Sequence, residues 1–548
     1  MKTFSSLYRQ EYISQITKNL DLLVIGGGIT GAGILLDARL RGLKVGLIEM
    51  QDFSSGTSSR STKLIHGGLR YLRQMEFSLV AEVGRERKIV HDLAPHITSP
   101  EVMLLPLIKD GSLGKLAAYA GMNLYEYLAK VKLQEKNKML SKKQTLVKEP
   151  LLKEDILRGG ISYYEYRTDD SRLTVELLKE AITQGAVALN YTKASSFIYK
   201  DGKICGANVV DLLSNLEYEI RATKVVNATG PWVDTLDTLD DASVTPKLFL
   251  TKGVHIVVDG KRLPIKQSIY FDGDLKRMIF AIPREGKVYI GTTDTPYAGD
   301  YTNPEINIED KEYLLSSVNK MFPTVELKTS DIESGWAGLR PLIKQSKKSP
   351  SAISRKDEIF ISKSGLVTIA GGKLTGYRKM AERVVDTVTE EMQKNSRIMY
   401  GACSTDRTLL SGAKYGGAIQ YHDFLFRKSK QGTTVGLPLE ESSRLVRRYG
   451  SNVDKIFKNI QTGKNEAIAF EVPLPLYAEV LYGIEEECVA SPSDFFVRRT
   501  GKLYFDIDTV KKWKKPVGLM IGEKLGYTAK MMQQQLGKLE EEIRTATS

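Results

Sequence analysis

A glycine-rich turn between a short apolar strand and a helix constrains this chain more than any other feature. Residues 22–25 form a continuous apolar run, typical of a buried parallel strand, and residues 26–31 follow directly with the spacing G-x-G-x-x-G. A helix is expected over residues 29–41, and Gly42 is a natural stop for it. A second strand over residues 44–49 completes a βαβ unit, so the chain is expected to begin with a Rossmann-like α/β domain.

The residues of this turn are those that dinucleotide binding requires. Gly26 permits the tight turn, Gly28 lets the backbone approach a pyrophosphate, and Gly31 allows the helix to pack closely on the strand. The helix N-terminus offers unpaired N–H groups and partial positive charge to that pyrophosphate. Glu49 stands 18 residues after Gly31, where its carboxylate can accept hydrogen bonds from both ribose hydroxyls. The predicted contacts are Ile25, Gly26, Gly28, Thr30, Gly31 and Glu49.

Length and composition describe a globular protein of several domains. The chain has 548 residues, too many for one hydrophobic core, and about three or four structural units are expected. Hydrophobic residues make up 42% and charged residues 26%, which excludes intrinsic disorder as the main state. From about residue 400 onward, amphipathic helices dominate the pattern.

The net charge of +13 predicts a basic surface, which could bind anionic lipid or an anionic substrate, or simply keep the protein soluble. No aromatic-plus-basic signature of RNA binding is present, so nucleic acid is not an expected partner. The uncharged run at residues 22–36 is too short and too rich in glycine to span a bilayer, and the N-terminus does not resemble a signal peptide. Cys205, Cys403 and Cys488 form no CxxC pair and are expected to be reduced cytoplasmic thiols.

A run of small hydroxyl residues favours FAD over NAD as the dinucleotide. Residues 56–68 read GTSSRSTKLIHGG. Their backbone and side chains offer closely spaced hydrogen-bond donors, as a second chain segment in contact with the pyrophosphate and flavin would need. The alternative is a serine-rich surface loop, but such loops rarely end in a glycine pair followed by Leu69-Arg70-Tyr71. The predicted cofactor contacts in this loop are Thr57, Ser58, Ser59 and Thr62.

Several longer blocks resemble the FAD-dependent glycerol-3-phosphate dehydrogenases, and together they cover nearly the whole chain. The blocks are GTSSRSTKLIHGGLRYL from residue 56, YYEYRTDDSRLTVE from 163, NATGPWVD from 227, KGVHIVVDG from 252, GTTDT from 291, SGWAGLRPL from 334, GGKLTGYRKMAE from 371 and SPSDFFVRRTG from 491. The related glycerophosphate oxidases share these blocks but often carry an extra segment between SGWAGLRPL and GGKLT. Only 29 residues separate Leu342 from Gly372 here, which favours the dehydrogenase.

The resemblance implies a glycine-oxidase-like α/β FAD-binding domain, an inserted antiparallel-sheet substrate domain and an all-α C-terminal domain. The FAD-binding domain is expected to be discontinuous, over residues 1–95, 150–240 and 330–395. The substrate domain is expected over residues 96–149 and 241–329, and the helical domain over residues 396–548.

The resemblance also implies roles for particular residues. Those expected to line the substrate site are His66, Arg70, Tyr71, His255, Arg340, Arg355 and Lys373, and further FAD contacts are expected at Gly230, Gly372, Leu374 and Thr375. Cations suit a phosphate monoester, because planar arginine forks match phosphate oxygens. Lys373 could serve either the flavin or the substrate phosphate.

His255 is the expected general base, with Arg340 beside it to hold the developing alkoxide and the phosphate. An imidazole can be neutral at working pH and still accept the proton of the C2 hydroxyl. His66 is the competing base because it also precedes a glycine pair. No HxxxH or HExxH spacing occurs, so no metal site is expected.

The function implied is oxidation of sn-glycerol 3-phosphate to dihydroxyacetone phosphate, with electrons passed from non-covalently bound FAD to a membrane quinone. The chain is expected in the cytoplasm, docked peripherally on the anionic inner face of the cell membrane, and a homodimer is left open. The rival functions are a glycerol-3-phosphate oxidase that reduces oxygen to peroxide, a flavin amine or amino-acid oxidase, and a flavin-binding scaffold without catalysis.

Overall fold

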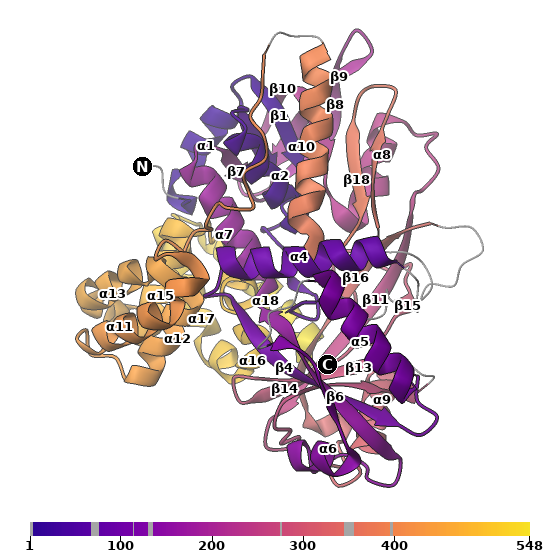
Figure 1. Ribbon diagram of the computed structural model, residues 1–548. Helices are drawn as coiled ribbons and strands as arrows, with labels where there is room; N and C mark the ends of the chain where they lie inside the picture. Colours follow the sequence, from indigo (N-terminus) through magenta and orange to yellow (C-terminus); the bar gives the residue numbers. More distant parts are fainter. Residues whose placement is uncertain are drawn as a thin grey trace.

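The computed structural model describes residues 4–66, 76–112, 114–129, 135–274, 277–344, 356–394 and 398–547. Within them the chain forms two large sheets and a C-terminal group of helices. Figure 1 shows the first sheet with its helices in the upper half, the second sheet in the lower half, and helices α11, α12, α13 and α15 at the left.

The first sheet contains the predicted βαβ unit. Its strand order is β17-β18-β10-β1-β2-β7, and all neighbours are parallel except β17, which pairs antiparallel with β18. A hairpin of β8 and β9 extends β10. The strands are β1 (Leu20–Ile25), β2 (Val45–Ile48), β7 (Val187–Leu189), β8 (Thr192–Lys200), β9 (Lys203–Asp211), β10 (Glu217–Asn227), β17 (Asp357–Ile361) and β18 (Val367–Gly371).

Strand β1 is buried on both faces, as its unbroken apolar sequence predicts. Leu22 and Val24 pack on one side against helices α2 (Ile29–Leu40), α7 (Asp170–Thr183) and α10 (Tyr377–Lys394). Leu23 and Ile25 pack on the other side with residues of α1 (Arg9–Ile16) and of the β8–β9 hairpin. The carboxyl end of β1 is therefore held inside the molecule.

The second sheet is mostly antiparallel, in the order β15-β11-β14-β13-β12-β4-β6-β3, with β16 on β11 and β5 on β6. Only β4 and β12 pair in parallel among its described strands. The strands are β3 (Leu64–Ile65), β4 (Thr98–Ile108), β5 (Lys138–Leu140), β6 (Leu157–Thr168), β11 (Leu248–Asp259), β12 (Ser268–Asp272), β13 (Met278–Arg284), β14 (Lys287–Gly291), β15 (Thr295–Pro296) and β16 (Ile332–Ile343).

Sheet membership differs from the expected domain boundaries at three strands. Strands β3, β6 and β16 fall in segments expected for the FAD-binding domain, yet they belong to the second sheet. The reason is pairing along their length: β6 lies antiparallel to β4 from Thr98 to Ile108, and β16 lies antiparallel to β11 from Leu248 to Val258.

Helices cover both faces of the second sheet. Helix α9 (Ile308–Met321) packs on one face through Leu314, Val318 and Met321. The other face, with Tyr289 and Trp336, packs against the C-terminal helices α16–α18. Near this sheet lie α4 (Phe77–Leu93), α5 (Lys115–Ala129) and α6 (Lys142–Lys148), and α8 (Val233–Asp240) follows β10.

The described chain from residue 417 onward is mainly helical, as expected for the C-terminal part. Its helices are α11 (Tyr421–Thr433), α12 (Leu439–Tyr449), α13 (Val453–Thr462), α14 (Lys464–Ala469), α15 (Leu474–Glu486), α16 (Lys502–Phe505), α17 (Ile507–Lys524) and α18 (Ala529–Thr547). A π-helical turn, Asp494–Arg499, connects α15 to α16. Among the described helices, none has a stretch long and apolar enough to cross a membrane.

His96 is a buried histidine where the C-terminal domain meets the rest of the chain. Its ring lies against the backbone at Gly412 and Gly450, and neither ring nitrogen has a hydrogen-bond partner among the described residues. Burial lowers the pKa of His96 well below its usual value, and the charges of Arg172 and Lys179 lower it further. The folded chain therefore holds this imidazole neutral.

We predict that His96 makes folding less favourable in acid. Below the usual histidine pKa of about 6.5, the imidazole of His96 binds a proton in the unfolded state but not in the folded state. The free energy of unfolding therefore decreases as pH falls below about 6.5. Between pH 7.5 and 5.5 this loss is about 1.4 kcal/mol. Urea unfolding of the parent and His96→Leu at both pH values measures it, and an equal loss in the two proteins contradicts the prediction.

Candidate active site

One cavity brings together most of the residues singled out from the sequence. It lies at the carboxyl ends of β1, β2, β10 and β18, where α/β folds bind their ligands. The predicted residues that line it are Ile25, Gly26, Gly28, Thr30, Glu49, Thr57, Ser58, Thr62, His66, Gly230, His255, Arg340, Gly372, Lys373, Leu374 and Thr375. Gly31 and Ser59 lie behind this lining, and Arg70, Tyr71 and Arg355 lie outside the described residues.

The three motif glycines meet different constraints. Gly26 has φ +116°, and a Cβ there would lie 2.5 Å from the carbonyl oxygen of Ala228. A Cβ on Gly31 would lie 1.9 Å from the carbonyl oxygen of Gly26. Gly28 is less confined, since its Cβ would meet Ser58 Oγ at 3.1 Å. The fold itself therefore excludes side chains at Gly26 and Gly31, whereas Gly28 keeps the backbone accessible from the cavity.

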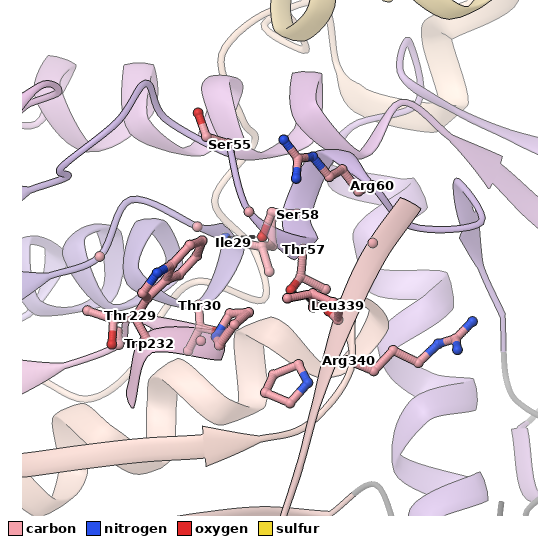
Figure 2. A pocket seen from close by; sticks show the side chains of 18 of the residues that line it. Ile29, Thr30, Ser55, Thr57, Ser58, Arg60, Thr229, Trp232, Leu339 and Arg340 are labelled. Atoms are coloured by element: carbon pink, nitrogen blue, oxygen red, sulfur yellow. Dashed lines mark hydrogen bonds between the residues drawn. The ribbon is translucent and has the colours of Figure 1, made fainter. Parts of the chain in front are cut away.

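The N-terminus of α2 opens into this cavity. The N–H of Ile29 donates to Ser58 Oγ at 2.9 Å, which joins the glycine turn to the hydroxyl-rich loop. Figure 2 shows Ile29, Thr30, Thr57 and Ser58 together at this end of the cavity. First-turn N–H groups have no partner within their helix, so this position suits an anion such as a pyrophosphate.

Glu49 stands at the end of β2 with its carboxylate already oriented. Its Oε2 accepts from the N–H of Gly27 at 2.7 Å and its Oε1 accepts from the N–H of Gln51 at 2.9 Å. Burial raises the pKa of Glu49, and these two hydrogen bonds oppose that rise. Each oxygen can accept a further bond, so the carboxylate can also receive ribose hydroxyls from the cavity side. Together with the α2 N-terminus, this donor and acceptor set fits a dinucleotide.

The hydroxyl-rich loop is fixed from both sides. Thr57 Oγ1, in the 3₁₀ turn η2 (Thr57–Ser59), donates to the carbonyl oxygen of Leu339 at 2.7 Å. Lys63 Nζ donates to Ser59 O at 2.9 Å and to Asp170 Oδ1 at 2.7 Å. The loop therefore spans from strand β16 of the second sheet to helix α7 of the first.

His255 lies on β11, between residues of two neighbouring strands. Its ring stacks on Trp336 of β16, with ring centroids 4.8 Å apart and an interplanar angle of 12°. On the other side, a Cβ on Gly291 of β14 would lie 2.2 Å from His255 Cδ2, so glycine makes room for the ring. Nε2 lies 3.0 Å from Thr62 Oγ1, and Nδ1 has no hydrogen-bond partner among the described residues.

The His255 imidazole is held neutral. Burial lowers its pKa well below the usual value, and the positive charges of Arg340 and Lys63 lower it further. A neutral ring has one nitrogen free to accept a proton. The site therefore holds His255 in the state that a general base requires.

The side chain of Arg340 lies over strand β11 at Gly253. A Cβ on Gly253 would lie 2.3 Å from Arg340 Nη2, so this glycine leaves space for the guanidinium. Arg340 donates to Thr293 O at 3.0 Å, to Asp294 Oδ1 at 3.2 Å and to Thr292 Oγ1 at 2.8 Å. In Figure 2, Leu339 lies beside Thr57, whereas the Arg340 guanidinium lies on the opposite side of strand β16.

The GGKLTG turn closes another part of the cavity. Gly371 and Gly372 have φ +77° and +87°, a left-handed conformation that favours glycine. They lead into the 3₁₀ turn η8 (Leu374–Gly376) and then α10. Thr375 Oγ1 donates to the carbonyl oxygen of His66 at 3.3 Å, so the turn contacts the segment that carries the second candidate base.

The cavity also contains residues that the sequence did not single out. Thr229 and Trp232 lie in the NATGPWVD block, which marks this turn without identifying the side chains that face the cavity. Thr192, Lys193 and Ala194 at the start of β8 line it too, and no motif marks them. Within the described ranges, no group of three or more His, Cys, Asp or Glu side chains is placed to hold a metal ion.

The fold and the site define a dinucleotide-binding α/β protein with a second, mostly antiparallel sheet beside the cavity. Residues 21–378 match the family described as "FAD dependent oxidoreductase". Residues 403–532 match "C-terminal domain of alpha-glycerophosphate oxidase".

Relatives extend the match along the chain. The aerobic glycerol-3-phosphate dehydrogenase of Bacillus subtilis is 52% identical over 94% of this chain and 93% of its own, and that of Staphylococcus haemolyticus is 51% identical over 97% and 96%. A structure of the Bacillus halodurans glycerol-3-phosphate dehydrogenase complexed with FAD has a TM-score of 0.87 at 47% identity, covering 100% of this chain and 99% of that chain.

The chain belongs to the FAD-dependent oxidoreductase family, within the group of the aerobic glycerol-3-phosphate dehydrogenases, and its cofactor is FAD. A Mycoplasma pneumoniae glycerophosphate oxidase with FAD bound has a TM-score of 0.55 at 15% identity, over 71% of this chain and 97% of that chain, which shows a shared fold only.

Proposed function

We propose that this chain oxidises sn-glycerol 3-phosphate to dihydroxyacetone phosphate. The names of its full-length relatives support this substrate, at 52% and 51% identity. The observation that carries the proposal is the placement of a neutral histidine, His255, and of Arg340 and Lys373 in the same cavity as the dinucleotide-binding turn. A base and several cations suit an alcohol that carries a phosphate dianion.

The residues that would hold FAD are the glycine turn, Glu49 and the loop from Thr57 to Thr62. FAD would supply the acceptor for the hydride that leaves C2 of the substrate. The turn from Gly371 to Leu374 brings backbone N–H groups at the start of a helical segment to the cavity, and their partial positive charge would favour negative charge there.

His255 would take the proton of the C2 hydroxyl at Nε2. With its proton on Nδ1, the neutral ring presents Nε2 as an acceptor toward Thr62 Oγ1, 3.0 Å away in the cofactor loop. Stacking on Trp336 fixes the ring plane. Arg340 would hold the developing alkoxide and the phosphate, while Asp294 and Thr292 orient its guanidinium. Lys373 would contribute a further charge to the flavin or the phosphate.

We predict that FAD is bound without a covalent bond. Among the described residues that line the cavity, none is a cysteine, and the histidines are His66 and His255, to which we assign roles with the substrate. Acid precipitation should therefore leave the yellow flavin in the supernatant, as measured by absorbance. Flavin that stays in the washed pellet contradicts the prediction.

We predict that the electron acceptor is a membrane quinone and that the chain docks at the cytoplasmic face of the membrane. The net charge of +13 supports attraction to an anionic lipid surface. On centrifugation, the protein should sediment together with vesicles that contain anionic lipid. Salt near 1 M should release it, because the screening length for electrostatic attraction falls to about 3 Å. Vesicles of neutral lipid are the control and should leave it in solution.

The acceptor itself is tested by turnover. With glycerol 3-phosphate as substrate, a soluble quinone should stimulate the rate, and oxygen alone should support only slow turnover. Rapid release of peroxide in equal amount to the product, without stimulation by quinone, identifies an oxidase instead.

We predict that His255→Ala slows anaerobic reduction of the flavin by glycerol 3-phosphate about 10²–10⁴-fold, the usual contribution of a general base. The flavin spectrum should show that FAD stays bound. The parent rate should fall as acid protonates the base, and this acidic limb should be absent in the variant. His66→Ala is the matched comparison: if it alone removes the acidic limb, or if His255→Ala reduces its flavin normally, the assignment is wrong.

A further inference from the structure

The block SPSDFFVRRTG from residue 491 contributes no side chain to the cavity lining, yet residues 491–500 are all buried. Its π-helical turn, Asp494–Arg499, carries two consecutive arginines. Buried guanidinium groups require acidic partners, because an unpaired charge away from water is strongly unfavourable. The position of those partners indicates what the block does.

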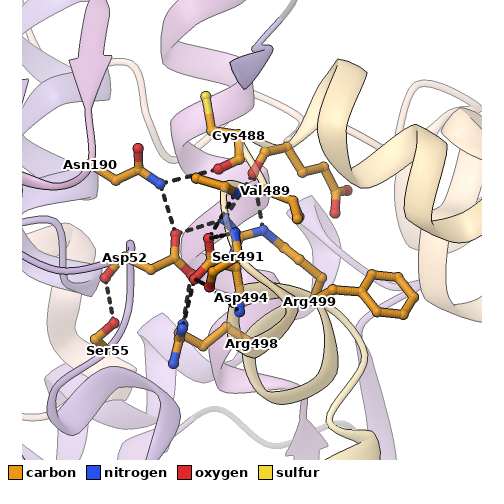
Figure 3. Close-up of polar contacts among 12 residues, drawn as sticks. Asp52, Ser55, Asn190, Cys488, Val489, Ser491, Asp494, Arg498 and Arg499 are labelled. Atoms are coloured by element: carbon orange, nitrogen blue, oxygen red, sulfur yellow. Dashed lines mark hydrogen bonds and ion pairs between the residues drawn. The ribbon is translucent and has the colours of Figure 1, made fainter. Parts of the chain in front are cut away.

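Both arginines bind the same carboxylate in the FAD-binding domain. Arg498 Nε donates to Asp52 Oδ2 at 2.6 Å, and Arg499 donates through Nη1 to Oδ2 at 2.7 Å and through Nη2 to Oδ1 at 2.9 Å. Asp52 is 1% exposed. Burial would raise its pKa, but Arg499 and Arg498 hold the pKa below its usual value, so Asp52 is ionised. Figure 3 shows the three side chains converging.

The network continues to the segment that leads from β7 to β8. Asn190 Nδ2 donates to Asp52 Oδ1 at 3.0 Å and to the carbonyl oxygen of Cys488 at 3.1 Å. Tyr191 OH donates to Asp494 Oδ1 at 2.6 Å, and Arg498 Nη2 donates to the same oxygen at 2.8 Å. Two arginines and two aspartates thus join two loops of the first sheet to the C-terminal domain.

Those two loops form one end of the cofactor cavity. Asp52 follows Glu49 by three positions in the sequence. The N–H of Thr192 donates to Glu49 O at 2.7 Å, and the N–H of Tyr191 donates to Gln51 O at 2.8 Å. Glu49, Gln51 and Thr192 all line the cavity. On the side away from the cavity, the network therefore fixes the backbone that carries the Glu49 carboxylate.

The backbone of these segments needs such support. Ser54, Tyr191 and Cys488 have φ values of +66°, +51° and +51°, a left-handed conformation unfavourable for residues with a Cβ. Each lies within or beside the network, and such conformations persist where surrounding contacts fix them.

We propose that Asp52, Arg498 and Arg499 are positioning residues through which the C-terminal domain sets the turn after β2 for binding FAD. The C-terminal domain is then part of the cofactor site although it does not line it. This inference rests on the proposed role of Glu49 in holding FAD.

The test is FAD affinity, measured by equilibrium dialysis of the apoprotein with flavin fluorescence. Asp52→Asn removes the charge and keeps the shape, and we expect the Kd for FAD to rise about 10- to 100-fold, the range for losing charge-assisted hydrogen bonds. The kcat with saturating FAD and the KM for glycerol 3-phosphate should remain within about threefold of the parent values, because Asp52 acts on binding. Arg498→Lys keeps the charge but cannot span both aspartates, and it should shift the Kd in the same direction.

Glu487→Gln is the matched control. Glu487 is also a buried carboxylate at this domain boundary, and its side chain binds Arg172 and Lys179 of α7. Only its backbone carbonyl joins the network, where it accepts from Arg499, and among the described residues its carboxylate has no bond to the turn after β2. We expect it to lower the melting temperature and leave the Kd for FAD unchanged. If Glu487→Gln raises the Kd as much as Asp52→Asn, the network acts through stability alone and the proposal is overturned.

Glu49→Gln separates the proposal from the function on which it rests. If neither Glu49→Gln nor Asp52→Asn weakens FAD, the assignment of this end of the cavity is wrong. If Glu49→Gln weakens FAD while Asp52→Asn and Arg498→Lys do not, the site assignment stands and the positioning role is overturned. Should Asp52→Asn fail to fold, Arg498→Lys decides the matter by the same measurement.

Discussion

The close contact among Gly26, Gly31 and Ala228 is the constraint on which the rest of the site depends. Without side chains at both glycines, α2 can lie directly on β1, and β10 can run beside the turn. That contact places the N-terminus of α2 at the carboxyl ends of the parallel strands. The loop that carries Ser58 then binds the first turn of α2, and through Thr57 it reaches β16 of the second sheet. At the cavity, a single loop therefore bonds to elements of both sheets.

The βαβ unit and the helical C-terminal part could be predicted because their signals are local. An apolar run, spaced glycines and helical periodicity all act within about 20 residues, the scale over which sequence patterns are informative. The sheet boundaries could not be predicted in this way, since β16 pairs with β11, whose sequence lies far upstream. The surroundings of Asp52 are a stronger case: an aspartate after a strand has no distinctive signal until Arg498, 446 residues later, folds against it.

In the candidate site too, some features have local sequence signals and others depend on contacts between distant segments. His255 and Arg340 could be singled out from their blocks, but the features that govern their chemistry come from other strands. Gly291 and Trp336 fix the plane of the His255 ring, and Gly253 leaves the path for Arg340. The neutral state of the imidazole follows from burial beside two cations, which depends on how β11, β14 and β16 pair. Residue type can indicate a base, whereas its protonation state is a property of the folded surroundings.

Buried charges are concentrated where the C-terminal domain meets the FAD-binding domain. Asp52 with Arg498 and Arg499, and Glu487 with Arg172 and Lys179, are almost completely buried ion pairs across that boundary. Well-packed apolar residues could hold two domains together equally strongly, because desolvation offsets much of the attraction between buried charges. Apolar contacts, however, tolerate sliding, whereas a bidentate arginine fixes both distance and angle. A boundary built from such pairs suits a domain that must dock in one orientation. Through Asp52, these pairs also hold the turn after β2, whose residues Glu49 and Gln51 line the cavity.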